Sequence, residues 1–234
     1  MHVNGTYTQY PVVKAQWAIK LPANVPYEQL APFMCSGGTA YTAVKATEAK
    51  TGQSVVVFGA GGGVGHMVVQ FCKAKGYKTI GVDLGADKTE TVKNAGADAY
   101  IDLSVTKADD LPAEVQKLTD GLGAHAAIVA AGNGKAYAAA PTVLRPLGTV
   151  VAVGLPPIGT SVLGAEPAVA CFKGIKFRGI LVTTRQDMKD ALALLEAGKV
   201  KEHVTLLPFK EFPAALERCA KSQTKGRQVI DFNA

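Results

Sequence analysis

The residues best placed to do chemistry are a run of glycines between a strand pattern and a helix pattern. The apolar stretch Ser54–Phe58 leads directly into the sequence GAGGGVG, and a helical pattern follows it. Glycine lets the chain turn with positive φ, and it lets backbone N–H groups approach a phosphate without a Cβ in the way. The start of the next helix adds free N–H groups and a partial positive charge. The turn therefore predicts a dinucleotide pyrophosphate site formed by Gly59, Gly61, Gly62, Gly63, Val64 and Gly65.

An acidic residue beyond the turn indicates which dinucleotide is bound. The last glycine comes one residue later than in G-x-G-x-x-G, but the next strand pattern ends at Asp83, close to the spacing of about 20 residues that places a carboxylate on the adenosine ribose. This carboxylate would repel a 2′-phosphate and no arginine follows it closely, so NAD is favoured over NADP. Lys88 either reaches the same ribose or is a solvated residue at a helix start. No Lys-Ser/Thr follows the glycines, which excludes a nucleoside triphosphate loop.

Alternating strand and helix patterns surround the turn and indicate the fold class. Several expected strands are continuous apolar runs, which is typical of parallel strands buried on both faces. This alternation predicts an α/β fold with a doubly wound parallel Rossmann sheet of six strands. The expected strands are Ser54–Phe58, Thr79–Asp83, Ala99–Asp102, Ala126–Ala130, Thr149–Val153 and Lys176–Val182. The expected helices are Thr39–Lys50, Gly63–Lys75, Asp87–Asn94, Leu111–Thr119 and Lys135–Leu144.

The two ends of the chain differ from this central pattern. Prolines and other turn residues in segment 1–34 predict short extended pieces there. Beyond residue 182, we expect an amphipathic helix, a short strand, a second helix and a last strand. These lie at Gln186–Gly198, His203–Leu207, Phe212–Ala220 and Gln228–Phe232.

Composition excludes several classes of protein. The net charge of +6 comes from Lys and Arg scattered among acidic residues, with no dense basic run, so we expect no nucleic-acid partner. No apolar run approaches the length of a membrane helix and no secretory signal is visible, so we expect a cytoplasmic protein without a membrane span. The cysteines lie far apart without a Cys-x-x-Cys pair, which argues against a disulfide scaffold and a self-contained zinc knuckle.

Taken together, these motifs resemble the zinc-dependent alcohol dehydrogenases of the medium-chain dehydrogenase/reductase superfamily, especially their yeast-like branch. The resemblance spans nearly the whole chain. It is carried by Ala31–Tyr41 (APFMCSGGTAY), by the glycine turn, and by His66 followed by Val69-Gln70. The turn is longer in that branch, which accounts for the late last glycine.

The resemblance implies roles for particular residues. Cys35 would be one ligand of a catalytic zinc ion, and Thr39 would contact the nicotinamide side of the site. Asp83 and Lys88 would bind the adenosine ribose, and Arg227 would reach the pyrophosphate. The ends of two strands would present backbone groups to the nicotinamide, at Val129, Val153 and Leu155.

The resemblance also implies parts that this chain does not show. Such enzymes take their other catalytic ligands, a cysteine and a Gly-His-Glu histidine, from an N-terminal GroES-like domain, and neither motif occurs here. We therefore expect segment 1–34 to be a distal remnant of that domain, 35–182 the NAD-binding Rossmann domain, and 183–234 the return to the catalytic domain. Catalytic zinc needs three protein ligands. Hydride transfer between an alcohol and NAD, with zinc as Lewis acid, is thus expected to be impaired in this chain.

Two other functions stay open at this point. One is a zinc-free, NADPH-dependent quinone or enoyl reductase of the same superfamily, and the other is a non-catalytic NAD-binding protein. The expected partners are a small alcohol, aldehyde or ketone and further copies of the chain. Lys176–Val182 comes last in the sheet, and an unpaired edge strand favours a dimer or tetramer. His66, His125 and His203 show no acid–base partner in the sequence, so we interpret them as structural or solvated.

Overall fold

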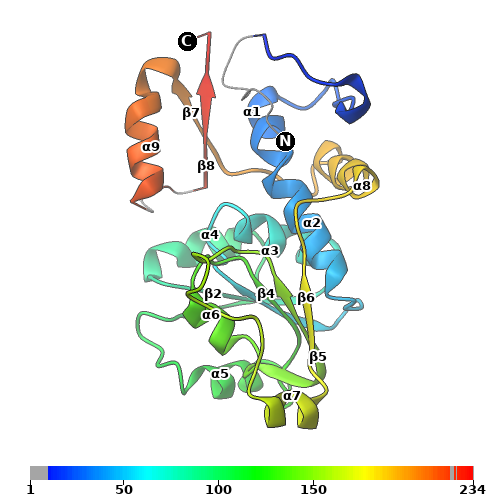
Figure 1. The fold of residues 1–234 in the computed structure, drawn as a ribbon, viewed down its shortest axis with the longest axis vertical. Coiled ribbons are helices and arrows are strands. Elements are labelled where there is room, and N and C mark those ends of the chain that lie inside the picture. Colours follow the sequence, from blue (N-terminus) through cyan, green and yellow to red (C-terminus); the bar gives the residue numbers. More distant parts are fainter. Residues whose placement is uncertain (1–9, 222–223, 225, 234) are drawn as a thin grey trace.

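A computed structural model describes residues 10–221, 224 and 226–233. It shows a large sheet domain and a smaller lobe above it (Figure 1). Residues 1–9 of the predicted N-terminal segment lie outside the described residues. The helices are α1 (Tyr27–Phe33), α2 (Ser36–Ala46), α3 (Gly65–Ala74), α4 (Thr89–Asn94), α5 (Leu111–Lys117), α6 (Gly134–Ala139), α7 (Pro167–Lys173), α8 (Arg185–Glu196) and α9 (Phe212–Ala220). The strands are β1 (Ser54–Phe58), β2 (Lys78–Asp83), β3 (Ala99–Asp102), β4 (Ala124–Val129), β5 (Leu144–Ala152), β6 (Lys176–Gly179), β7 (Val204–Pro208) and β8 (Arg227–Asp231).

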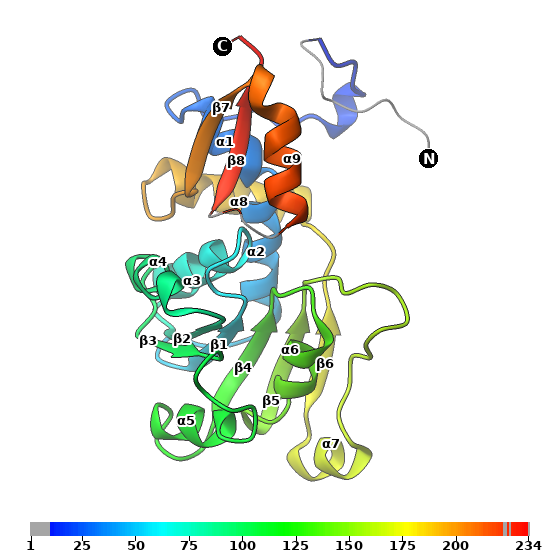
Figure 2. The ribbon, with the colours of Figure 1, turned by 90° about the vertical axis from the view of Figure 1, so that its left-hand side faces the viewer.

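The large domain is a six-stranded sheet with the order β3-β2-β1-β4-β5-β6, and every neighbouring pair is parallel. This confirms the predicted doubly wound Rossmann sheet. The order reverses between β1 and β4, and ligands of such sheets bind at this switch point, beyond the carboxyl ends of the strands. Figure 2 shows these ends pointing toward the smaller lobe.

Burial on both faces of β1 explains why the sheet is covered by helices on both sides. Val55 and Val57 pack into one apolar cluster with α2, α3 and α8, while Val56 and Phe58 pack into the other with α5 and α6. All five residues of β1 are buried. A strand of this kind lies in the centre of a parallel sheet.

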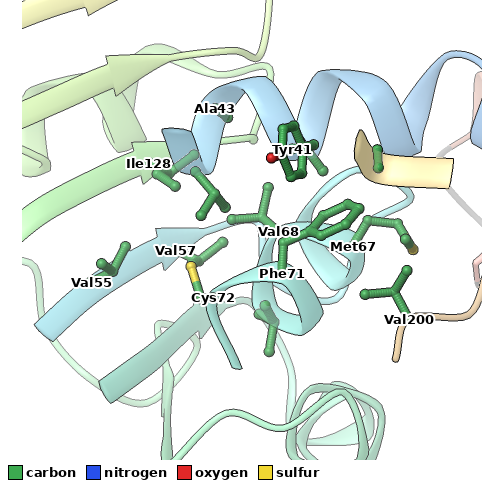
Figure 3. Packing of buried hydrophobic residues seen from close by; sticks show 14 of the residues in the cluster. Tyr41, Ala43, Val55, Val57, Met67, Val68, Phe71, Cys72, Ile128 and Val200 are labelled. Carbon is green, nitrogen blue, oxygen red and sulfur yellow. The ribbon is translucent and has the colours of Figure 1, made fainter. Parts of the chain in front are cut away.

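Helix α3 is seated on the sheet by one apolar face (Figure 3). Val68, Phe71 and Cys72 are fully buried there, and the Tyr41 ring meets Phe71 edge to face at 5.5 Å between centroids. Burial raises the pKa of the Cys72 thiol to about 12, so this cysteine is a packing residue rather than a nucleophile. The packing fixes the start of α3, which is the end that faces the glycine turn.

The smaller lobe joins residues from both ends of the chain. Strands β7 and β8 pair in parallel, α9 lies between them in sequence, and α1 packs against them. The strand, helix and strand expected beyond residue 200 are therefore confirmed. Whether this lobe and α8 are parts of a GroES-like domain stays a prediction, as does the division of the chain at residues 34 and 182.

The structure differs from several local expectations, and the strand expected at Lys176–Val182 ends at Gly179. Segment 1–34 is not only extended, because burial of Leu30 and Phe33 stabilises helix α1 after Pro26. The helix expected to end at Leu144 ends at Ala139, and Leu144 begins β5 instead. Helix α7 was not expected, and none of its residues is buried. No helix among the described residues is long and apolar enough to cross a membrane.

Candidate functional site

The glycine turn between β1 and α3 is folded tightly on itself. Gly59 has a φ of 76°, its N–H donates to the Val82 carbonyl oxygen at 2.8 Å, and the Gly62 N–H donates back to the Gly59 oxygen at 3.0 Å. A Cβ at Gly65 would overlap that same Gly59 oxygen. Only glycine at position 65 allows α3 to begin so close to the end of β1.

Asp83 ends β2 beside this turn, as the spacing predicts. Its Oδ2 accepts the Gly61 N–H at 2.8 Å, and its Oδ1 accepts the Leu84 N–H at 2.8 Å and the Lys88 ammonium at 2.7 Å. The Asp83 side chain is 10% exposed. Lys88 also lies over the turn, since a Cβ at Gly61 would meet its Cδ at 2.8 Å. The structure thus brings together three of the predicted cofactor-binding residues.

Arg227, at the start of β8, reaches the other side of the turn. A Cβ at Gly63 would lie 2.9 Å from its Nη1, and its Nε is buried without a hydrogen-bond partner among the residues that the structure describes. In the same described part of the chain, the backbone N–H groups of Gly63 and Val64 have no acceptor. We call Gly59–Gly65, Asp83, Lys88 and Arg227 the dinucleotide cradle. Its open donors suit an anion, because backbone N–H groups at a helix start and a guanidinium both bind phosphate.

The ends of β4 and β5 form the next part of this edge. The Val129 carbonyl oxygen accepts the N–H groups of Val153 at 3.1 Å and Gly154 at 2.9 Å, which ties the two strand ends together. Gly154 is packed against the Ala131 backbone, with no room for a Cβ. Leu155 follows in a loop and is 81% exposed. The predicted backbone positions therefore lie together at the carboxyl edge of the sheet, while the Leu155 side chain is largely exposed to solvent.

Cys35 lies at the break between α1 and α2, and we call residues 35–39 the Cys35 junction. The Cys35 side chain is exposed, and its carbonyl oxygen accepts the Thr39 N–H at 3.0 Å, at the first turn of α2. No three His, Cys, Asp or Glu side chains within the described ranges come together in a way that could hold a metal ion. A tight zinc site needs three such ligands, so the described residues do not fit a bound zinc ion.

Comparison with known proteins agrees with this arrangement. A sequence model of the family described as zinc-binding dehydrogenase matches residues 63–197. Alcohol dehydrogenase 1 of Emericella nidulans is 37% identical over 98% of this chain and 65% of that protein, and the alcohol dehydrogenase of Rhizobium meliloti is 38% identical over 99% and 65%. The solved alcohol dehydrogenase of Aeropyrum pernix superposes with a TM-score of 0.80 at 29% identity, over 91% of this chain and 61% of that one.

The chain belongs to the zinc-binding dehydrogenase family. The matched residues run from Gly63 in the glycine turn to the end of α8, so they include the whole sheet from β2 onward. The resemblance to zinc-dependent alcohol dehydrogenases is therefore confirmed. The chain spans about 65% of the length of these curated relatives.

This family member also holds a buried polar pair that the sequence did not reveal. The His66 Nε2 lies 3.3 Å from Glu202 Oε2, and the His66 side chain is buried, which agrees with its interpretation as a structural rather than a solvated histidine. His125 also has partners, Ser54 and Arg145, and burial followed by the nearby Arg145 charge lowers its pKa. Glu202 lies in a short stretch with no motif, and no periodic signal links it to α3. Only the tertiary fold brings the two residues together.

Proposed function

We propose that the dinucleotide cradle binds NAD(H) rather than NADP(H), and that the protein takes part in hydride transfer between a small alcohol and its aldehyde or ketone. One observation carries the cofactor choice. The Asp83 carboxylate is fixed by the Gly61 N–H and by Lys88 at the end of β2, where the adenosine ribose of a dinucleotide is bound. A carboxylate there accepts ribose hydroxyls and repels a 2′-phosphate.

The rest of the cradle suits the other parts of the cofactor. The open N–H groups of Gly63 and Val64 and the buried Arg227 Nε would hold the pyrophosphate. A cavity of about 400 Å³ lies beside Gly63 and Arg227, and the rest of its lining comes mainly from α9 and β8. Backbone groups at Val129 and Val153 would orient the nicotinamide, together with Thr39. When bound, NAD supplies the carbon atom that accepts the hydride.

Substrate chemistry comes from the relatives and not from a visible pocket. Three relatives similar to this chain at 36–38% identity are named alcohol dehydrogenases, which supports an alcohol or carbonyl substrate. Cys35 as a zinc ligand is part of the proposal only as one donor, and we derive no catalytic step through a metal. A cytoplasmic location and a dimer or tetramer also remain proposals; the exposed edge strand β6 supports the second.

A binding titration followed by a turnover assay tests this function. We expect the purified chain to bind NADH at least tenfold more tightly than NADPH, measured by the fluorescence of the reduced nicotinamide. The variant Asp83→Ser should lose this preference, while the control Asp109→Ser, in an exposed loop, should keep it. Preference for NADPH would contradict the cofactor assignment and favour the zinc-free reductase. Clear NADH binding without alcohol-dependent NADH formation would favour a non-catalytic NAD-binding protein.

A further inference from the structure

His66 and Glu202 form an almost completely buried pair outside the cofactor-binding residues. His66 is the second residue of α3, Glu202 lies just before β7, and their side chains are 3% and 0% exposed. An isolated carboxylate in such a place is strongly destabilising unless it is paired and hydrogen-bonded. Its partners therefore matter.

The His66 ring has neighbours on both sides. Its Nδ1 lies 3.0 Å from the Gly62 carbonyl oxygen, and because a carbonyl only accepts, Nδ1 carries a hydrogen. On the other side of the ring, Nε2 accepts the His203 backbone N–H at 3.3 Å and lies 3.3 Å from Glu202 Oε2. That carboxylate oxygen is buried and has no hydrogen-bond partner in the described part of the chain, so the imidazole is its polar neighbour. The ring is thus held between Gly62, His203 and Glu202.

Glu202 is held in place from several elements, through its backbone as well as its carboxyl group. The Ser36 hydroxyl lies within hydrogen-bonding distance of Glu202 Oε1. The Gln29 side-chain amide accepts the Glu202 N–H at 2.9 Å and donates to the Glu202 carbonyl oxygen at 3.1 Å. In the same way, Gln70 clamps Lys201, with bonds of 2.8 and 2.9 Å. Glu202 is thus a fixed anchor between α1, α2 and α3.

From this anchor, His66 holds one peptide group of the glycine turn. The Gly62 carbonyl oxygen accepts both the His66 backbone N–H and the His66 Nδ1–H, each at 3.0 Å. In a trans peptide, the C=O and the next N–H point in opposite directions. Fixing the Gly62 oxygen toward His66 therefore turns the Gly63 N–H outward, where it has no acceptor in the described part of the chain.

We propose that His66 and Glu202 are positioning residues for the dinucleotide pyrophosphate. They touch no cofactor themselves; they hold the Gly62–Gly63 peptide so that its N–H is ready for a phosphate oxygen. The same segment orients the Arg227 side of the cradle, because the Arg227 N–H donates to the His203 carbonyl oxygen at 2.7 Å. The proposal rests on dinucleotide binding at the cradle, but it does not depend on which nicotinamide cofactor is used.

Binding measurements with three ligands distinguish a positioning role of the pair from a general effect on the stability of the fold. ADP-ribose and NADH contain the pyrophosphate, whereas adenosine contains only the part that meets Asp83. Glu202→Leu and His66→Phe break the pair from either side, and we expect each to weaken ADP-ribose and NADH at least tenfold while adenosine binding stays within about twofold. Glu202→Gln keeps an acceptor for Ser36 and offers an N–H to His66, so it should retain most of the affinity. Glu196→Gln, at the exposed end of α8, is the matched control.

The outcomes distinguish this proposal from the proposed function. Unchanged ADP-ribose affinity in both apolar variants, or an equal loss for all three ligands, would overturn the positioning role. A Glu202→Gln variant as weak as Glu202→Leu would overturn it too. A protein that prefers NADPH yet shows the selective loss of ADP-ribose would contradict the NAD(H) assignment and support the positioning role.

Discussion

The dinucleotide cradle and the Cys35 junction lie on neighbouring elements, but they are built from contacts of different range. In the cradle, Gly61 and Lys88 bond to Asp83, which is 22 and 5 residues away in sequence. On the helix that follows Cys35, Ser36, Thr42 and Lys45 bond to residues 166, 141 and 142 positions away. The first region is nearly complete within one βαβ unit. The second depends on the return of the chain after the sheet.

The two regions also differ in what they can do. The cradle combines open backbone donors, a guanidinium with a buried Nε and a fixed carboxylate, which are the groups that a dinucleotide needs. The junction presents one exposed thiol, with no second and third metal ligand beside it among the described residues. We therefore expect variants in the two regions to have separate effects, on NADH binding in the cradle and on zinc binding at the junction.

The largest effect is expected from Gly65→Ala in the cradle. The added methyl group overlaps the Gly59 carbonyl oxygen, so the start of α3 must move away from β1. Overpacking of this kind costs about 1–3 kcal/mol or more. We expect a clear loss of free energy of unfolding in urea titrations and at least a tenfold weaker NADH affinity.

Gly164→Ala is the control for that experiment, since nothing lies within 4 Å of a Cβ at Gly164. It should change neither stability nor binding. Normal NADH affinity in Gly65→Ala would show that the tight turn is not needed for the cofactor.

The difference in contact range also explains what could be predicted from the sequence. Apolar runs such as Ser54–Phe58 and the glycines that follow them act over a few residues, so the sheet and the Asp83 position were predictable. Helix α1 was missed because its buried residues pack against α2, α3 and α8, which come later in the chain. The His66–Glu202 pair was missed for the same reason. No local pattern marks a side chain whose partner is brought to it only by the tertiary fold.

A second, smaller effect is expected from Arg227, the one long-range member of the cradle. Removing the guanidinium in Arg227→Gln should weaken NADH about tenfold, which corresponds to about 1.4 kcal/mol for a charge-assisted contact. The affinity of the variant should also depend less on salt concentration. Arg227→Lys keeps the charge but not the planar fork, so we expect an intermediate affinity. Equal affinities in all three proteins would remove Arg227 from the cradle.

A still smaller effect is expected where α2 meets α8. The Asp187 carboxylate accepts a hydrogen bond from the Lys45 ammonium group at 2.6 Å, away from the cradle. This bond holds the Asp187 pKa below its usual value. The folded pKa is the lower one, so this contribution to stability is present above the unfolded pKa of about 3.9 and is lost as the pH falls through the folded pKa. Asp187→Asn should lower the thermal midpoint by no more than a few degrees at pH 7, because the Lys45 side chain is 61% exposed and solvent screens the pair.

The difference in thermal midpoint between wild type and Asp187→Asn should shrink toward zero as the pH of the melting experiment is lowered, and also in high salt. The NADH affinity of the variant should equal that of wild type at pH 7 in low and in high salt. The exposed pair on α9 offers a control, since Glu217 and Lys221 are 3.8 Å apart, and Glu217→Gln should leave the midpoint unchanged. A gap that widens on acidification would contradict the assignment of the lowered pKa to a stabilising Asp187.

The smallest effect on the cofactor is expected from Cys35→Ser. The thiol is exposed, and among the described residues the Cys35 backbone bonds only to Pro32 and Thr39, so NADH affinity should stay within about twofold of wild type. Zinc should respond differently: one thiolate holds the ion weakly, so the wild-type chain should retain less than one zinc per chain after dialysis, and Cys35→Ser should retain less still, measured by atomic absorption. A tenfold loss of NADH affinity would contradict the separation of the two regions. Stoichiometric zinc in the wild-type chain would show that ligands beyond the described residues complete the junction.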